Sequence, residues 1–343
     1  MTKHFVTGAA GFLGRHIVEK LCQQGETDTI AFDILQCADT FKGVTYVQGS
    51  VLNRELLLEL TRTVDYIYHT AALVPLTKSG EEFYNVNVVG TRNIVECCKH
   101  NSIKKLVHIS SSAIYGLPQD MPITDKTEYA PIEIYGQSKL DAENEVRHYM
   151  DEGGSASCIR PRTIIGGKSR LGIFQMLFEW ISEGRNIYVI GDGNNLFQFL
   201  HVDDLIDAII KAALSENSGL YNIGAARYKT LREDLEELCA YAKTTSKVRG
   251  LPVGLTKCVL YVMDKFKVSP LAPWHYLTYH KPFVFDISKA QRELKWSPTH
   301  SNIEALIESY EWYLAHRQQM VDSKSAHTKP VQQGILKIIK FFS

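Results

Sequence analysis

A tyrosine and a lysine one helical turn apart, Tyr135 and Lys139 in YGQSK, follow a run of hydroxyl side chains in SSSAIYG, residues 110–116. Residues at i and i+4 of a helix share a face, so the Lys139 ammonium can stabilise the phenolate form of Tyr135. Tyrosine ordinarily titrates near pH ~10 and needs such a charge to act as a base near neutrality. A serine hydroxyl from the run can hold a reacting oxygen against the phenol. These groups suit proton transfer to or from a secondary alcohol or ketone.

Oxidation of an alcohol also requires a hydride acceptor, and the start of the chain predicts a site for one. Gly8, Gly11 and Gly14 lie in VTGAAGFLG, between an apolar strand-like run and a helical period. Glycines at these positions permit a tight turn and close approach of a pyrophosphate to the helix N terminus. Asp33, nineteen residues beyond Gly14, can accept from ribose hydroxyls and would repel a 2′-phosphate, which favours NAD over NADP. A purely structural glycine turn is the alternative.

Strand-like and helical segments alternate through the first half of the chain. Apolar strand-like runs are expected at 3–8, 29–34, 44–49, 64–72 and 104–112. Helical periods lie between and after them, at 12–25, 85–101 and 138–150. Buried strands separated by helices predict an α/β fold with a Rossmann-type doubly wound parallel sheet. Further helices at 171–184 and 201–214 flank strands at 186–195 and 219–224, and helices dominate from residue 225.

This pattern predicts two domains and a tail. We expect residues 1–165 and 198–224 to form the NAD-binding domain, and residues 166–197 and 225–317 to form a smaller, mostly helical substrate domain. Such a domain would close over the carboxyl ends of the strands, where open α/β sheets bind ligands. Residues 318–343 read as a polar linker and an amphipathic tail.

Composition narrows the function classes. Thirty-eight basic and 38 acidic residues give a formal net charge of zero, so we expect no nucleic-acid partner. The seven cysteines lack metal-type spacing, which predicts no metal, reduced thiols and a cytoplasmic location. The opening residues enter a strand at once, so no signal peptide is expected, and no apolar run reaches the ~18–20 residues of a spanning helix.

Six motifs, in order, resemble the extended short-chain dehydrogenase/reductase superfamily: TGAAGFLG, HTAA, SSSAIYG, YGQSK, IRPR and HVDDL. The resemblance runs to about residue 315 and includes its epimerase/dehydratase and sterol dehydrogenase-like branches. It implies that Tyr135 is the acid/base, and that Lys139 is its activator and a ribose contact. Ser111 falls on the catalytic hydroxyl position, with Ser112 as second choice.

The resemblance also implies residues around the cofactor. Asn87 matches an asparagine of the helix behind the site, and we interpret His69 of YHTAA as a core histidine that supports the loop. A homodimer is expected because relatives form one. Besides the three glycines, Asp33, Tyr135 and Lys139, the implied cofactor contacts are Phe12, Leu13, Ala71, Ala72 and Pro161.

Two departures from the superfamily patterns bear on the substrate. Members that resemble 4,6-dehydratases carry an acidic pair after the catalytic hydroxyl, where this chain has Ser112 and Ala113; dehydration is therefore not expected. Sugar-nucleotide enzymes typically place an arginine four residues before the histidine of HVDDL, where this chain has Phe197. An apolar residue there resembles the sterol dehydrogenase branch, although Arg162 or another arginine could compensate. We expect Ser112, Arg162 and Phe197 to line the substrate pocket.

Three functions remain open from the sequence. The first is an NAD-dependent oxidoreductase for a secondary alcohol or ketone, with a slight preference for a bulky hydrophobic, sterol- or lipid-like substrate. The second is a nucleotide-sugar 4-epimerase with tightly bound NAD, and the third is a non-catalytic NAD-sensing protein. The tail at 334–343, GILKIIKFFS, has the pattern of a short peripheral membrane anchor; docking on the protein itself or on a second subunit is the alternative.

Overall fold

The computed structural model describes residues 2–26, 28–37, 40–74, 80, 82–167, 171, 174–265 and 273–318. Its centre is a seven-stranded parallel sheet in the order β10-β6-β5-β4-β1-β2-β3. The strands are β1 (His4–Thr7), β2 (Thr29–Asp33), β3 (Val44–Gln48), β4 (Tyr66–His69), β5 (Lys105–Ile109), β6 (Ala156–Pro161) and β10 (Gly219–Ile223). The strand order reverses beside β1, which is the arrangement of a doubly wound sheet.

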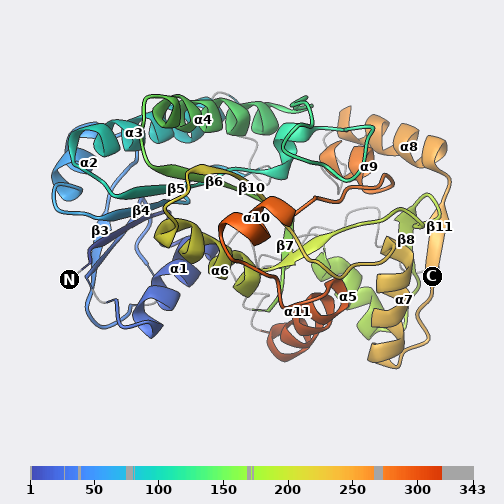
Figure 1. Cartoon of the computed structure of the whole chain (residues 1–343). Coiled ribbons are helices and arrows are strands. Elements are labelled where there is room, and N and C mark those ends of the chain that lie inside the picture. Colours follow the sequence, from blue (N-terminus) through green and yellow to red (C-terminus); the bar gives the residue numbers. More distant parts are fainter. Residues whose placement is uncertain are drawn as a thin grey trace.

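Helices cover both faces of this sheet (Figure 1). On one face lie α1 (Phe12–Gln23) and α6 (Val202–Leu214), and on the other lie α2 (Arg54–Leu60), α3 (Gly90–His100) and α4 (Ile134–Asp151). Strands β1, β5 and β6 are buried along their whole length, as expected for a parallel sheet between two helical layers. The predicted Rossmann-type α/β fold is confirmed.

Most of the remaining elements lie beyond the carboxyl ends of the strands (Figure 1). Two small parallel pairs form there, β7 (Thr163–Ile165) with β9 (Phe199–His201) and β8 (Ile187–Ile190) with β11 (Val248–Leu251). The helices are α5 (Phe174–Ser182), α7 (Leu231–Ala242), α8 (Val253–Lys265), α9 (Pro273–Thr278), α10 (Ser288–Glu293) and α11 (Asn302–His316). Capping boxes begin both α7 and α11, which satisfies first-turn N–H groups that a helix cannot bond internally.

Two helices that bear on the site differ from the sequence-based expectation. The segment expected as one helix at 85–101 begins with a π-helical stretch, η1 (Tyr84–Val89), before α3. Helix α4 begins at Ile134, four residues earlier than expected, so Tyr135 lies in its first turn. The extended backbone of Glu133, two residues after Pro131, sets this start. The tail at 334–343 lies outside the described residues.

Candidate active site

The glycine-rich turn lies at the carboxyl end of the central strand, β1. Gly8 has a φ of +71°, and a Cβ there would lie 2.8 Å from the backbone of Ala71 in the loop after β4. A Cβ on Gly14 would lie 2.2 Å from the Gly8 carbonyl oxygen, so both positions require glycine. A Cβ on Gly11 would meet only that same carbonyl oxygen, at 3.1 Å, which leaves its other side open for a close approach.

This turn fits a dinucleotide. Phe12 and Leu13 begin α1, whose N-cap residue is Gly11 with no side-chain cap among the described residues; the positive end of the helix dipole at this terminus favours a phosphate. Asp33 ends the neighbouring strand, where its carboxylate accepts from the Ala10 and Leu35 N–H groups at 3.0 and 2.9 Å. The carboxylate is thus held beside the turn, where a ribose hydroxyl can reach it.

The helix that carries Tyr135 and Lys139 meets the serine run at the carboxyl end of β5, two strands away from β1 in the sheet. Lys139 is buried, and its Nζ donates to the carbonyl oxygen of Ile109, the last residue of β5, at 2.6 Å. A Cβ on Gly136 would lie 2.8 Å from the carbonyl oxygen of Ala113, so the first turn of α4 packs closely on the 3-10 helix η2 (Ser112–Tyr115). The fold therefore brings the element that carries Tyr135 to the serine run.

Ser111 and Ser112 differ in access. Ser111 is half-buried and precedes η2, where its Oγ accepts from the Ala113 N–H at 3.1 Å. That bond leaves the Ser111 hydroxyl hydrogen available to donate. Ser112 is buried. Access favours Ser111 as the hydroxyl that contacts a substrate oxygen.

Asn87 connects the cofactor side of the site with the tyrosine helix. It is buried, and its Oδ1 accepts from the Leu73 N–H at 2.8 Å while its Nδ2 donates to the Ser138 Oγ at 2.9 Å. Ser138 in turn donates to the Tyr135 carbonyl oxygen at 2.8 Å. Asn87 lies in the π-helical stretch, and such stretches are frequent at functional sites because the extra residue re-aims a side chain.

His69 is a buried support for this loop rather than a free ring. Its two ring nitrogens pair with the Thr7 and Thr91 hydroxyls at 2.7 and 3.0 Å. Burial, together with the Lys139 charge, lowers the pKa of His69 to about 3, so the ring is neutral. Burial also lowers the pKa of Lys139 to about 8, against the opposing influence of Cys158 and Glu143. Below that pH Lys139 remains an ammonium next to the site.

A second buried cation stands behind α4 and is fully compensated. Arg160 on β6 donates from Nε to the buried carboxylate of Glu143 at 2.9 Å and pairs with it again through a terminal amine. Its other contacts are the hydroxyls of Tyr115 and Tyr129, at 2.6 and 2.7 Å. The ion pair between Arg160 and Glu143 holds α4, the helix that carries Tyr135, against the sheet.

Arg162 and Phe197, two of the three residues predicted for the substrate pocket, lie close to the carboxyl edge of the sheet. Pro161 ends β6, and the N–H of the next residue, Arg162, donates to the Ile223 carbonyl oxygen at 2.9 Å. The guanidinium of Arg162 lies over the Phe197 and Phe283 rings, with its Cζ 4.5 and 4.2 Å from the centroids. Phe197 is buried, so its ring belongs to an aromatic cluster rather than to an open surface.

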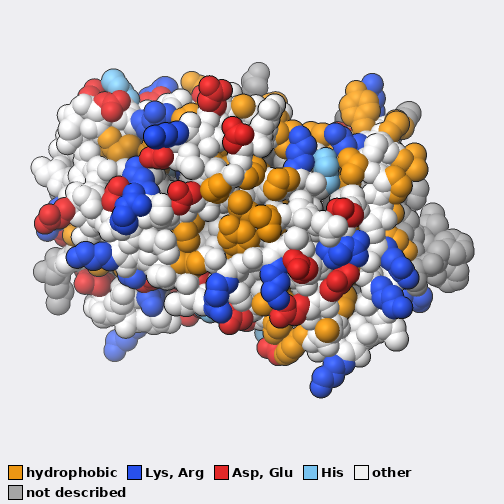
Figure 2. Space-filling view, turned by 45° about the vertical axis from the view of Figure 1, so that its right-hand side comes forward, with side chains coloured by type: hydrophobic (Ala, Val, Ile, Leu, Met, Phe, Trp, Pro, Cys, Tyr) orange, Lys and Arg blue, Asp and Glu red, His pale blue; other side chains and the backbone are white. Residues whose placement is uncertain are grey.

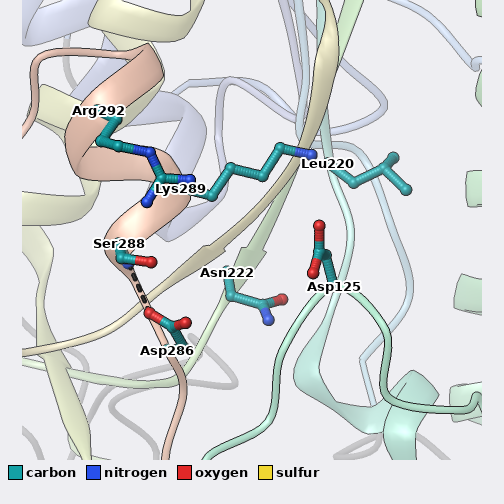
Figure 3. A pocket seen from close by; sticks show the side chains of 7 residues that line it. All are labelled: Asp125, Leu220, Asn222, Asp286, Ser288, Lys289 and Arg292. Carbon is teal, nitrogen blue, oxygen red and sulfur yellow. Dashed lines mark hydrogen bonds between the residues drawn. The ribbon is translucent and has the colours of Figure 1, made fainter.

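A separate polar pocket lies beside β10, at the start of α10 (Figure 3). It is lined by Asp125, Leu220, Asn222, Asp286, Ser288, Lys289 and Arg292. None of these belongs to the residues predicted for the cofactor or the reaction. This pocket is connected with the candidate site through Asn222, whose Oδ1 accepts from the Tyr115 hydroxyl at 2.9 Å. Tyr115 is the last residue of η2.

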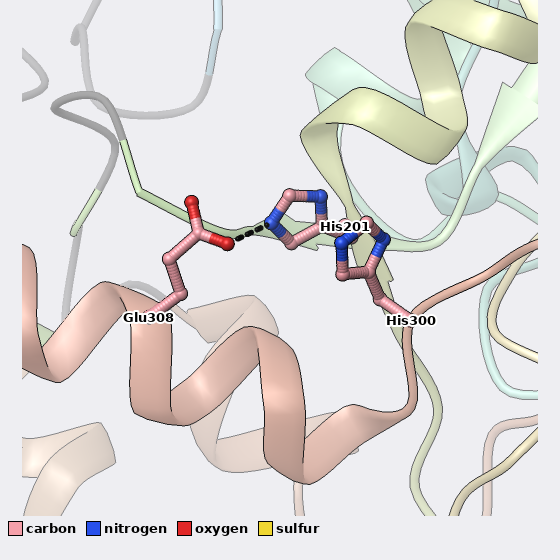
Figure 4. Close-up of side chains that lie close together, drawn as sticks. All are labelled: His201, His300 and Glu308. Atoms are coloured by element: carbon pink, nitrogen blue, oxygen red, sulfur yellow. Dashed lines mark hydrogen bonds and ion pairs between the residues drawn. The ribbon is translucent and has the colours of Figure 1, made fainter.

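His201, His300 and Glu308 also lie together, with ligand-type atoms within 4.8 Å of one another (Figure 4). The sequence did not predict this cluster. The Nδ1 of His201 accepts from the Asp203 N–H at 3.1 Å, so its Nε2 carries the hydrogen and donates to Glu308 at 2.9 Å. The two imidazoles are stacked, with centroids 3.8 Å apart. A donating Nε2 is no metal ligand, and the hydrogen bonds account for the cluster as a cap that joins α6 to α11.

The surface shows no single dominant charge on the face in Figure 2, where lysine, arginine and acidic side chains are interspersed. None of the helices among the described residues has the length and apolar character needed to cross a bilayer.

The geometry defines a class of protein: an NAD-dependent enzyme of the extended short-chain dehydrogenase/reductase type, with a glycine turn on β1 and a tyrosine helix beside β5. A model of the NAD dependent epimerase/dehydratase family matches residues 4–224. The chain belongs to this family.

The similar relatives include one uncharacterized protein and members with two different chemistries. An uncharacterized protein of Sinorhizobium fredii, y4nG, is 37% identical over 338 residues, 98% of this chain and 85% of that protein. The decarboxylating sterol-4-alpha-carboxylate 3-dehydrogenase of Bos taurus is 32% identical over 224 residues, 63% of this chain and 62% of the relative. This chain thus spans less than two thirds of the sterol enzyme. The UDP-glucose 4-epimerase of Lactobacillus helveticus is 27% identical over 347 residues, 92% of this chain and 98% of that protein.

Solved structures share the fold. The crystal structure of UDP-glucuronic acid 4-epimerase from Bacillus cereus in complex with NAD superposes with a TM-score of 0.73, at 23% identity, over 92% of this chain and 99% of that chain. NAD is the cofactor of the family and of this chain, in agreement with the turn and with Asp33. The roles of individual site residues stay predictions.

Proposed function

We propose that this enzyme transfers hydride between NAD and a secondary alcohol or ketone of a bulky, hydrophobic, sterol- or lipid-like substrate. One observation carries the proposal. A buried lysine, one turn behind Tyr135, bonds the end of the strand that leads to Ser111. This arrangement supports a proton-transfer site at the carboxyl edge, where parallel sheets bind their ligands.

In oxidation, Tyr135 removes the proton of the substrate hydroxyl while NAD supplies the hydride acceptor. The Ser111 hydroxyl donates to the reacting oxygen and holds it against the phenol. The Lys139 ammonium favours the phenolate of Tyr135, because an opposite charge nearby stabilises the charged form of an acid. In reduction the same tyrosine returns the proton to the ketone oxygen.

The preference for a hydrophobic substrate rests on Phe197. Its ring packs on Phe199 and Tyr279, with centroids 5.0 and 5.1 Å away, at a position where sugar-nucleotide enzymes typically place an arginine. The 32% identity to the sterol dehydrogenase of Bos taurus supports the same direction.

A nucleotide-sugar 4-epimerase is the second candidate. The UDP-glucose 4-epimerase of Lactobacillus helveticus aligns over 92% of this chain, and the guanidinium of Arg162 lies over the Phe197 ring. An epimerase would use the same Tyr135 chemistry and return the hydride to the opposite face of a transient ketone.

Cofactor retention separates the two candidates. The protein is purified without added nucleotide and denatured, and the released dinucleotide is quantified. An epimerase must keep its cofactor through both hydride transfers, so near-stoichiometric NAD would favour the epimerase. A largely empty protein that binds NADH reversibly would favour the dehydrogenase.

With either substrate, Tyr135→Phe should reduce turnover by ~10²–10⁴-fold; unchanged turnover would overturn the proposed chemistry.

A cytoplasmic homodimer completes the proposal. Its support is the resemblance to dimeric relatives, and sedimentation of the purified protein tests it directly. Peripheral membrane contact through residues 334–343 would bring the enzyme to lipid-like substrates.

A further inference from the structure

Arg162 is a buried cation whose charge no described residue neutralises. Its side chain is only 3% exposed. Its Nε donates to the Phe283 carbonyl oxygen at 3.0 Å, and one terminal amine donates to the Thr163 hydroxyl at 3.0 Å. A guanidinium has five N–H donors, so these two neutral acceptors leave three donors and the positive charge without an anionic partner in the described part of the chain.

The two buried arginines of β6 and its extension differ in this respect. Arg160 holds the buried Glu143 in a two-pronged pair. No carboxylate among the described residues lies within ion-pair distance of Arg162, whose surroundings are the Phe197 and Phe283 rings. Burial lowers the pKa of Arg162 to about 9, with Tyr279 the one opposing influence. Keeping an uncompensated charge buried costs stability, so such a residue marks a functional site unless something pairs with it.

The location of Arg162 connects it with the predicted reaction centre. Strands β5 and β6 are neighbours, with Ile109 paired to Ile159, so Ser111, two residues beyond β5, and Pro161, the last residue of β6, lie at the same edge. Arg162 is the next residue, and its guanidinium reaches the aromatic cluster around Phe197 that covers this edge. It occupies the space beside position 197, where sugar-nucleotide enzymes typically hold their arginine.

We propose that Arg162 binds an anionic oxygen group, a carboxylate or a phosphate, of the substrate whose alcohol or ketone reacts at Tyr135. The assignment rests on the proposed function and narrows it, because the substrate becomes an anion with a hydrophobic body. The guanidinium packs against the Phe197 and Phe283 rings, and its planar fork favours a bidentate pair with a flat, two-oxygen acceptor.

The test measures binding rather than turnover, with enzyme saturated with NADH. One probe is a 3-hydroxysteroid that bears a carboxylate at carbon 4, compared with the same steroid without the carboxylate. The other probe is UDP. Titration calorimetry gives the dissociation constants for the wild type, Arg162→Met, which removes the charge at similar length, and Arg162→Lys, which keeps the charge without the planar fork. Arg227→Met is the matched control, because Arg227 is an exposed arginine paired with Glu304.

We expect Arg162→Met to lower the affinity for the anionic probe by about 10- to 100-fold, as for loss of a charge-assisted pair. The probe concerned is the one that the wild type binds. The affinity for the neutral steroid and for NADH should change less than about twofold, and Arg162→Lys should recover part of the loss. Loss confined to the steroid acid identifies a carboxylate, and loss of UDP binding identifies a diphosphate.

Equal loss for the acid and the neutral steroid would indicate packing alone and overturn the proposal, as would a wild type that binds neither anion at about 1 mM. Full turnover in Tyr135→Phe would refute the proposed function, whereas the Arg162 dissociation constants do not depend on turnover.

Discussion

Replacement of Lys139 by methionine should stabilise the protein while it removes the reaction. The buried lysine titrates at about 8 rather than at its usual 10.5, so its ammonium is disfavoured in the folded state. At pH 7 that shift corresponds to about 3 kcal/mol of lost stability, and at pH 9.5 to about 1 kcal/mol. Loss of the bond to the Ile109 carbonyl oxygen offsets part of the gain, by about 1.5 kcal/mol.

The pH dependence distinguishes this cause from a general change in packing. Because the folded pKa lies below the unfolded value, the unfolded chain binds more protons between about pH 8 and 10.5. The lysine contribution to wild-type stability therefore rises with pH across that window, and Lys139→Met should remove that rise. The advantage of the variant over the wild type should shrink by about 2 kcal/mol between pH 7 and 9.5.

Urea unfolding at the two pH values measures this advantage directly. Lys211→Met is the control, since Lys211 is a partly exposed lysine paired with Asp207 one turn away and such pairs contribute little. Turnover of Lys139→Met should fall by ~10²-fold or more. An advantage that is the same at both pH values, or a Lys139→Met protein less stable than the wild type at pH 7, would refute the assignment of Lys139 as a desolvated ammonium.

Three further changes test other parts of the site. Asp33→Ala should weaken NADH binding by about 10-fold and relax discrimination against NADPH; fluorescence titration that shows unaltered preference contradicts the ribose role. Asn87→Ala leaves the Leu73 N–H and carbonyl oxygen without their side-chain partner and removes the bond that the Ser138 hydroxyl accepts, so the free energy of unfolding should fall by about 2–4 kcal/mol; the exposed Asn144→Ala control should change it little. Deletion of residues 334–343 should release the protein from anionic liposomes in a flotation assay, and equal binding with and without them would end the anchor hypothesis.

Elements with a strong local pattern could be predicted from the sequence. The strand, turn and helix at the start of the chain are predictable from the sequence because the turn itself requires Gly8 and Gly14. The parallel sheet is predictable because its strands are continuous apolar runs. Tyr135 and Lys139 are predicted from their helical spacing together with the dinucleotide motif that precedes them and the resemblance to the superfamily, and α4 starts four residues before the expected helix. These signals are local, so the sequence alone contains them.

Features that depend on tertiary contacts were not predictable. The motif IRPR, residues 159–162, spans the end of β6; its two arginines and its proline break the apolar pattern, and only the pair with Glu143 shows how Arg160 is buried. Asn87, in the π-helical stretch, bonds to Leu73 and Ser138, which are distant in sequence. Phe197 was expected to line a pocket, but its burial against Arg162 is a property of the packed fold.

The buried guanidinium of Arg162 lowers the thermal stability of the protein while it provides the proposed contact with an anionic substrate. Apolar replacement of a buried ion is often neutral or stabilising, so a laboratory selection for thermal tolerance alone would tend to enrich Arg162→Met or Arg162→Leu. The survivors would be well folded and unable to distinguish an acid from its neutral analogue. Conversely, an anion that pairs with Arg162 binds only the folded chain and raises its melting temperature. A thermal-shift screen of organic acids and nucleotides therefore offers a direct route to the natural substrate.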